Sequence, residues 1–199
     1  HIQGLGFFTP LYTPDIEVHI WGPVSATQDL RARLTRYLSP PLFPVRLRDL
    51  EGVEIHDLRP GVLEWGAFTV TAEIVTHPGH TLGLRLEDEA GVLTYISDHE
   101  PALGVADFPE SAQWTSGAAL AEGADVLIHD AQYTDEEYGQ RVGWGHSTFE
   151  QALAFDSLAN VDRFVTFHHD PGHSDELLDR ILDEILRTHD LPFELIPGK

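Results

Sequence analysis

Short hydrophobic runs alternate with helix-type segments through the second half of the chain, and this alternation constrains the fold more than any other feature. Residues 126–128 and 164–167 are such runs, and strands buried on both faces have this composition. Ser147 with Glu150 is a capping pair that predicts a helix between the two runs, and Ser174 predicts the start of an amphipathic helix after them. Strands and helices in alternation predict an α/β fold built of layers.

The first half of the chain is richer in strand patterns. Residues 15–20 alternate between hydrophobic and polar side chains, which predicts a half-buried strand. Ser25 with Gln28 is a second capping pair and predicts the start of a helix. The leucines that would share the hydrophobic face of that helix are Leu30, Leu34 and Leu38.

Two stretches in the middle of the chain predict a β-hairpin. They are residues 82–86 and 92–96, with the turn at residues 88–91. Residues 192–196 predict a final edge strand. A length of 199 residues suits one domain with a sizeable core, so we expect residues 1–199 to form a single domain.

The composition limits the partners of the protein. Asp and Glu number 33 against 12 Lys and Arg, so the net charge is −21, which argues against transfer RNA and favours a small substrate. The chain has no Cys, so any metal must use His and carboxylate ligands, which suit zinc, manganese or iron. No hydrophobic run approaches the ~20 residues that span a bilayer. We therefore expect no membrane contact and a cytoplasmic location.

Several chemically capable side chains follow predicted strands directly. Asp98, Asp130 and His168 each stand at such a strand end. Because the ends of neighbouring strands converge on one crevice in layered α/β folds, we expect these residues to meet at a common site. The 12 His residues of the chain recur in the company of Asp and Gly, which also indicates a site rather than scattered surface residues.

Two pairs of His residues leave the identity of the metal ligand open. His77 precedes a Pro-Gly turn that could aim its imidazole, and His80 lies within reach of the same turn. His168 and His169 are adjacent, and adjacent side chains on a strand point to opposite sides. Only one of the second pair can then face a given metal, unless the chain turns between them.

His146 stands directly before the predicted helix start at Ser147. A helix N-terminus attracts anions, and a His there could donate a proton to a bound phosphate; the alternative is an extended capping motif. Asp130 could orient a neighbouring His, or form a buried structural pair with His129. The remaining candidates are expected to be ordinary surface residues: His19, His56 and His189.

Taken in order, these motifs resemble the metallo-β-lactamase superfamily, and within it the ribonuclease Z and phosphodiesterase-like branch. The opening residues from His1 to Phe8 look like the last His of the family motif HxHxDH and its continuation. The other matching segments are His77-Pro78-Gly79, Tyr95-Ile96-Ser97-Asp98, Leu127-Ile128-His129-Asp130-Ala131-Gln132-Tyr133, Gly145-His146-Ser147-Thr148 and Phe167-His168-His169-Asp170-Pro171. The resemblance covers nearly the whole chain.

The resemblance implies a four-layer αββα sandwich with a site for two divalent metal ions, with zinc expected first and manganese or iron as alternatives. By position, His77 would bind the first metal, His1 and His168 the second, and Asp98 would bridge both. The HxHxD residues are absent before His1. We therefore expect the chain to lack the N-terminal part of the family domain, including its first strands.

The resemblance also implies a metal-dependent hydrolase, with Asp98 and His146 as catalytic residues and His80, Asp130 and His169 near the metals or the substrate. The leading expectation is a phosphodiesterase that acts on a small or nucleotide-like, cyclic phosphodiester through a metal-bridged hydroxide. The alternatives are a lactone, thioester or acyl hydrolase of the same fold, or a non-catalytic domain that retains the fold. A second copy of the chain, in a homodimer, is a further candidate partner.

Overall fold

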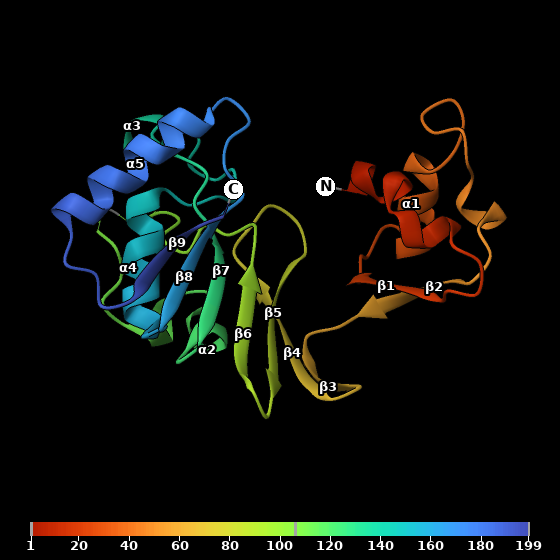
Figure 1. Cartoon of the computed structure of the whole chain (residues 1–199), viewed down its shortest axis with the longest axis horizontal. Helices are drawn as coiled ribbons and strands as arrows, with labels where there is room; N and C mark the ends of the chain where they lie inside the picture. Colours follow the sequence, from red (N-terminus) through yellow and green to blue (C-terminus); the bar gives the residue numbers. More distant parts are fainter. Residues whose placement is uncertain (1, 106, 199) are drawn as a thin grey trace. The chain divides into compact units, whose positions relative to one another are not determined.

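The computed structural model describes residues 2–105 and 107–198, and the chain divides into two compact units, His1–Arg59 and Pro60–Lys199. The two units are coloured red to orange and yellow to blue in Figure 1. Each unit has its own cluster of buried hydrophobic residues. The expectation that residues 1–199 form a single domain stays a prediction.

The first unit is a two-stranded parallel sheet with one α-helix and three short 3-10 helices. Strand β1 pairs with β2 in parallel, with Val18 opposite Val53 and Pro23 opposite Leu58. The leucines of α1 are buried as predicted, and they pack against Ile20, Val53 and Ile55 of the sheet. The elements are η1 (Ile2–Phe7), η2 (Thr9–Tyr12), β1 (Val18–Pro23), α1 (Leu30–Tyr37), η3 (Leu47–Asp49) and β2 (Val53–Leu58).

Two predicted boundaries in the first unit are wrong. The predicted strand at residues 15–20 begins only at Val18 and continues to Pro23. The helix is capped by Asp29, whose side chain accepts a hydrogen bond of 2.6 Å from the Ala32 backbone N–H, and not by Ser25. Asp29 directly precedes the first helical residue, so its carboxylate reaches the free N–H groups of the first turn, which Ser25 does not.

The second unit is built on a seven-stranded mixed sheet with the order β3-β4-β5-β6-β7-β8-β9. Strands β3 to β6 pair antiparallel, and β6 to β9 pair parallel. The predicted hairpin is confirmed as β5 and β6, and the predicted final strand is β9 at the sheet edge. The strands are β3 (Gly61–Trp65), β4 (Phe68–Val75), β5 (Thr81–Asp88), β6 (Gly91–Ile96), β7 (Val126–Asp130), β8 (Arg163–Phe167) and β9 (Glu194–Pro197).

Helices cover the parallel part of this sheet, as Figure 1 shows for α4 and α5. The hydrophobic stripe of α5 is buried through Leu178, Leu182 and Ile185, while Leu186 on its flank is 58% exposed. The mixed α/β architecture agrees with the predicted fold class. The helical elements are η4 (Ala112–Trp114), α2 (Ala118–Ala121), α3 (Asp135–Tyr138), α4 (Phe149–Ala159) and α5 (Asp175–Thr188).

The strand directions place four strand ends at one edge of the sheet. Strand β4 runs antiparallel to β5, which runs antiparallel to β6, so β4 and β6 point the same way. Strands β7 and β8 are parallel to β6. The segments that follow β4, β6, β7 and β8 therefore emerge side by side, which is where layered α/β folds gather functional side chains.

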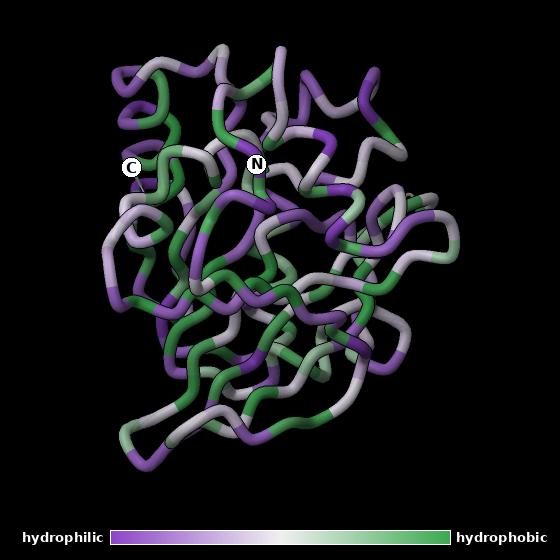
Figure 2. The backbone as a smooth tube through the Cα atoms, turned by 90° about the vertical axis from the view of Figure 1, so that its right-hand side faces the viewer, coloured by the Kyte–Doolittle hydropathy of each residue, from purple (hydrophilic) through white to green (hydrophobic). Residues whose placement is uncertain are grey.

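Hydrophobic and hydrophilic residues alternate over short stretches along the backbone, which Figure 2 shows as frequent changes between green and purple. This is the pattern of elements with one face in a core. Among the described residues, no helix is both long and hydrophobic enough to cross a bilayer.

A cluster of polar side chains lies inside the hydrophobic core of the second unit. His99, His129 and Asp156 are fully buried, with the His99 Nδ1 3.0 Å from the His129 Nε2 and the His129 Nδ1 3.7 Å from an Asp156 oxygen. In the described part of the chain, neither carboxyl oxygen of Asp156 has a hydrogen-bond partner. Burial lowers the pKa of His99 to about 3, lowers the pKa of His129 and raises the pKa of Asp156 well above its usual value, so burial favours the neutral form of all three groups.

We predict that Asp156→Asn becomes more stable relative to the wild type as the pH rises from 5 to 8. In the folded wild type Asp156 keeps its proton, whereas the unfolded chain releases it near the usual pKa. The contribution of Asp156 to the free energy of unfolding therefore falls as the pH rises toward the folded pKa, by at most about 1.4 kcal/mol per pH unit. Asn removes this dependence. Urea unfolding of both proteins at several pH values measures it, with the exposed Asp183→Asn as control. A pH-independent difference would show that Asp156 is ionised in the fold.

Candidate metal centre

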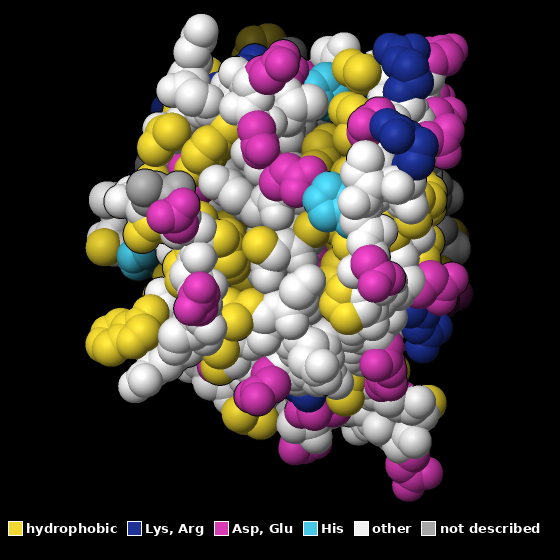
Figure 3. Space-filling view, turned by 90° about the vertical axis from the view of Figure 1, so that its left-hand side faces the viewer, with side chains coloured by type: hydrophobic (Ala, Val, Ile, Leu, Met, Phe, Trp, Pro, Cys, Tyr) yellow, Lys and Arg dark blue, Asp and Glu magenta, His cyan; other side chains and the backbone are white. Residues whose placement is uncertain are grey.

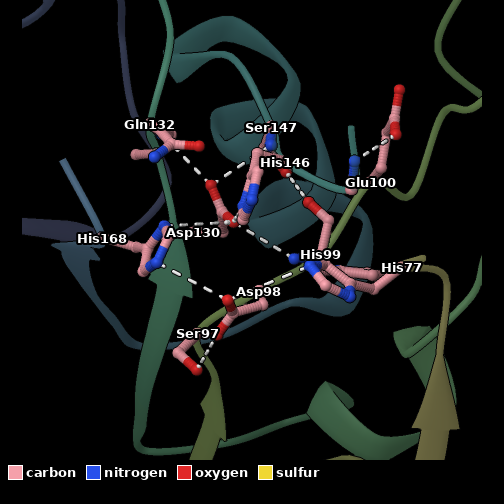
Figure 4. A network of polar contacts seen from close by, with 12 residues as sticks. His77, Ser97, Asp98, His99, Glu100, Asp130, Gln132, His146, Ser147 and His168 are labelled. Carbon is pink, nitrogen blue, oxygen red and sulfur yellow. Dashed lines mark hydrogen bonds and ion pairs between the residues drawn. The ribbon is translucent and has the colours of Figure 1, made fainter. Parts of the chain in front are cut away.

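His77, Asp98 and His168 converge at the shared strand edge of the second unit. They follow β4, β6 and β8, respectively. The Asp98 Oδ1 lies 4.0 Å from the His77 Nε2 and 3.5 Å from the His168 Nε2, so one carboxylate oxygen stands between two imidazoles (Figure 4). All three side chains are half-buried.

Neighbouring hydroxyl groups orient two of these ligand candidates. The Thr81 Oγ1 lies 2.9 Å from the His77 Nδ1, which leaves the other ring nitrogen of His77 facing Asp98. The Ser97 Oγ donates a 2.6 Å hydrogen bond to the Asp98 Oδ2, which leaves the Asp98 Oδ1 for the two imidazoles. Hydrogen bonds of this kind fix the tautomer and rotamer of metal ligands.

A turn of the backbone separates His168 from His169. His168 has a φ of 59°, in the left-handed region, so the chain bends at the point where β8 ends. The His169 ring instead stacks on Phe149, with its Nδ1 3.3 Å from the Ala131 carbonyl oxygen. Burial lowers the pKa of His168, which favours the neutral imidazole that binds a metal.

Asp130, at the end of β7, forms a tight pair with His146. The His146 Nδ1 lies 2.6 Å from the Asp130 Oδ2. The Asp130 carboxylate also accepts hydrogen bonds from the backbone N–H groups of His99 (3.1 Å), Gln132 (3.1 Å) and Ser147 (3.2 Å). Burial raises the pKa of Asp130, and the hydrogen bonds from His146, His99 and Ser147 limit the rise to about 6, so most Asp130 side chains are ionised at neutral pH.

The same pair sets the protonation of His146. Burial acts against the charged imidazole, but the hydrogen bond and the negative charge of Asp130 outweigh it and raise the pKa of His146 above its usual value. The His146 ring stacks on the His168 ring, with centroids 4.7 Å apart. Two neighbouring imidazoles therefore have pKa values shifted in opposite directions, which is typical of sites that divide metal binding and proton transfer between them.

The sequence predicts Ser147 as the N-cap of helix α4, and this prediction is wrong. Helix α4 is capped by Thr148, whose side chain accepts a 3.1 Å hydrogen bond from the Gln151 backbone N–H. The Ser147 hydroxyl instead donates a 2.7 Å hydrogen bond to the His99 carbonyl oxygen. Ser147 therefore joins the His146 segment to the chain after β6, and the cap moves by one residue.

Glu100 is a buried residue of the site that sequence analysis missed. Its carboxylate accepts hydrogen bonds from the Tyr138 hydroxyl (2.7 Å) and from the backbone N–H groups of Gly143 (2.7 Å) and Gly145 (2.8 Å). Gly143 and Gly145 belong to the loop that leads into His146, and Tyr138 is the last residue of α3 before that loop. Glu100 therefore anchors the loop to the segment that carries Asp98 (Figure 4). No local pattern reveals this role, because the three donors lie 38 to 45 residues further along the chain.

Gly145 shows how closely this loop approaches the centre. Its φ is 94°, and a Cβ atom at this position would collide with the His77 ring and with Pro78. Only glycine combines this backbone conformation with so close an approach. The glycines around Trp144 are the one feature of the sequence that could have indicated the loop.

The donor set fits divalent cations. Ligand atoms of His77, Asp98 and His146 form one group, and those of Asp130, His146 and His168 form another. Within each group the atoms lie within 4.8 Å of one another. Atoms bound to one ion at about 2.0–2.2 Å lie roughly 3–4 Å apart, close to the observed separations. Neutral imidazole and carboxylate suit zinc and similar metals.

His1 lies outside the described residues. His80 is exposed and belongs to neither of the two groups. The metal roles assigned to His1, His77, Asp98 and His168 stay predictions.

Comparison with known proteins identifies related sequences. A family model described as the beta-lactamase superfamily domain matches residues 1–169. Ribonuclease BN of Cronobacter sakazakii is 25% identical over 206 residues, covering 84% of this chain and 65% of the relative. Ribonuclease Z of Salinibacter ruber is 33% identical over 110 residues, covering 54% of this chain and 30% of the relative. The matches thus span less than two thirds of these curated relatives.

Solved structures show the same fold. The metallo-beta-lactamase fold protein YhfI from Bacillus subtilis superposes with a TM-score of 0.64 at 17% identity, covering all of this chain and 68% of that one. The short form of human tRNase Z superposes with a TM-score of 0.65 at 18% identity, covering all of this chain and 72% of that one. These likenesses confirm the predicted metallo-β-lactamase fold.

We predict that Glu100→Gln lowers the free energy of unfolding by about 1–3 kcal/mol, because the amide cannot accept all three hydrogen bonds and leaves a buried donor unsatisfied. Tyr138→Phe should cost less, since it removes one donor and leaves both backbone bonds. The exposed Glu136→Gln is the matched control and should stay within about 0.5 kcal/mol of the wild type. Urea unfolding of the three variants measures this, and equal stability of Glu100→Gln and the control would contradict it.

Proposed function

The chain belongs to the metallo-β-lactamase superfamily, in its ribonuclease Z-like branch, and we propose that it is a metal-dependent hydrolase of small or nucleotide-like phosphodiesters. One observation carries the proposal. The Asp98 Oδ1 lies between the His77 and His168 imidazoles, and the His146–Asp130 pair stands directly beside them. This arrangement supports the proposal of a cation-binding group and a proton donor at the same strand edge.

His77, Asp98 and His168 are the residues that would hold the divalent cations, and His1 is proposed as a further ligand. When bound, such a pair of cations lowers the pKa of a water molecule and neutralises charge on the substrate oxygens. The chain itself keeps His168 neutral through burial. Thr81 and Ser97 hold His77 and Asp98 in the orientation that binding requires.

His146 is proposed to donate a proton to the leaving oxygen of the substrate. Its Nδ1 faces Asp130, so its Nε2 is the nitrogen available to a substrate. The hydrogen bond and negative charge of Asp130 raise the pKa of His146, which favours the protonated ring that a proton donor needs. Asp130 is a positioning residue here, because its own oxygens are occupied by four donors from the protein.

The charge of the protein supports a small substrate over a long polyanion. Acidic side chains are spread over the face drawn in Figure 3, and basic side chains are few there. Since polyanion binding depends on clustered Lys and Arg, this face is unsuited to a nucleic acid backbone. A small phosphodiester needs only the local cations of the centre. The names of the relatives, ribonuclease BN and ribonuclease Z, support phosphodiester chemistry in general.

We predict that the intact protein, loaded with zinc or manganese, hydrolyses bis-p-nitrophenyl phosphate in preference to p-nitrophenyl acetate. His77→Ala and His168→Ala should each lose bound metal and at least about 100-fold in kcat/KM, because several kcal/mol of charge stabilisation disappear. The matched variants His80→Ala and His169→Ala should lose neither. Metal analysis and initial rates test this, and preferential hydrolysis of the aryl ester would overturn the phosphodiester assignment in favour of an acyl hydrolase.

We predict that the effect of His146→Ala depends on the leaving group. A poor leaving group such as an alkyl alcohol needs the proton, so kcat should fall by about 10²–10⁴-fold, whereas p-nitrophenolate leaves without one and kcat should fall far less. Asp130→Asn should show the same pattern with a smaller loss, and bound metal should be unchanged in both variants. A loss that is equal for every leaving group would mean that His146 has only a structural role.

A further inference from the structure

The first unit carries a group of polar side chains on the face of its sheet that α1 does not cover. Along β1 and β2, hydrophobic residues such as Ile20 and Ile55 point to the core, and the residues between them point away. In the parallel register, His19 lies opposite Glu54, and Trp21 lies opposite His56. Sequence analysis assigns His19 and His56 to the ordinary surface, but the structure brings them side by side.

The ligand atoms of this group form a compact triangle. The His19 Nδ1 lies 2.9 Å from the His56 Nε2, and the Glu54 Oε2 lies 3.6 Å from each of these nitrogens. In a tetrahedral site with bonds of about 2.0–2.1 Å, ligand atoms lie roughly 3.3–3.4 Å apart. The three atoms are therefore spaced as three corners of such a site, with little movement needed.

The surroundings of the triangle suit an ion. The side chains of His19, Glu54 and His56 are 41%, 59% and 27% exposed, so an ion can enter and a water molecule can complete its coordination. The Trp21 ring stacks on the His56 ring with centroids 4.2 Å apart and an angle of 19°, which holds that imidazole in place. Without an ion, the two imidazoles share a hydrogen bond through the same two nitrogens.

We infer that His19, Glu54 and His56 form a second metal site, which binds zinc and joins β1 to β2. Two imidazoles and one carboxylate are ligands that zinc takes in proteins, with the fourth position left to water. The ion would connect one strand to the other, since His19 belongs to β1 and the other two ligands to β2. All three ligands belong to the first unit, whereas the strand edge that carries Asp98 belongs to the second, so the two sites share no residue.

Zinc bound per chain, after equilibrium dialysis of the intact protein, tests the inference. Four proteins are compared: the wild type, His19→Ala/His56→Ala, His77→Ala/His168→Ala, and the combination of all four substitutions. We expect the His19/His56 change to remove about one zinc ion in either background, at free zinc of about 1 µM. His189→Ala is the matched control, because His189 lies 3.1 Å from one carboxylate, that of Glu150, but has no second imidazole beside it in the described chain.

The outcomes for this site and for the proposed function are separate. Zinc content unchanged by His19→Ala/His56→Ala would overturn the second site, whatever the His77/His168 change does. Loss of zinc with normal hydrolysis of bis-p-nitrophenyl phosphate would support it, because these residues are not part of the proposed reaction. If the double variant fails to fold, Glu54→Gln decides: it keeps both imidazoles, and it should weaken zinc binding by at least about 10-fold.

Trp21 offers an independent spectroscopic test. Copper(II) follows zinc into sites of this type with higher affinity and quenches the fluorescence of a nearby indole. We expect copper(II) to quench part of the tryptophan emission of the wild type, and this part to be absent in Trp21→Phe and in His19→Ala/His56→Ala. Equal quenching in all three proteins would contradict binding beside Trp21.

Discussion

The buried carboxylate of Asp130 joins the segments from which the candidate centre is built. Its four hydrogen bonds come from the segment after β6, from the chain directly after β7, and from the residues before α4. A buried charge of this kind is stable only when its hydrogen bonds are satisfied, so the three segments must adopt the arrangement that supplies them. Glu100 constrains the loop that leads into His146 in the same way, because its buried carboxylate needs the three hydrogen bonds that this part of the chain supplies. The position of His146 is therefore a consequence of two buried carboxylates.

Burial and nearby charges give the imidazoles of the second unit different pKa values, and therefore different chemical properties. His168 is held neutral by burial, as a metal ligand requires. His146 is equally close to the centre but has its pKa raised by the adjacent Asp130, as a proton donor requires. His99 and His129 are fully buried, and burial lowers the pKa of both, which favours the neutral imidazole within the core. The pKa of each imidazole thus depends on the balance between burial and a direct hydrogen bond to a carboxylate, which is 2.6 Å long at His146.

The two candidate metal sites collect their ligands in different ways. At the strand edge of the second unit, ligands come from the ends of strands that are distant in the sequence, and loops must be held in place by buried hydrogen bonds. On the sheet of the first unit, ligands come from directly opposed positions of two paired strands. The second arrangement needs only the regular spacing of a parallel pair, and the stacked Trp21 ring adds the remaining restraint. An ion there would stabilise a small sheet that has only two strands.

Local patterns in the sequence were sufficient to predict most strands and helices of the second unit and the chemical types of the site residues. The hairpin of β5 and β6, the buried stripe of α5 and the order of the His and Asp motifs follow from local periodicity and spacing. Contacts between residues that are distant in the sequence could be identified only from the tertiary structure. The choice between His168 and His169 depends on the left-handed backbone at His168. Glu100 meets donors at least 38 residues away, and His19 meets His56 through a parallel register 37 residues apart. Local patterns do not predict such pairings, because the pairings form only when strands and loops pack together.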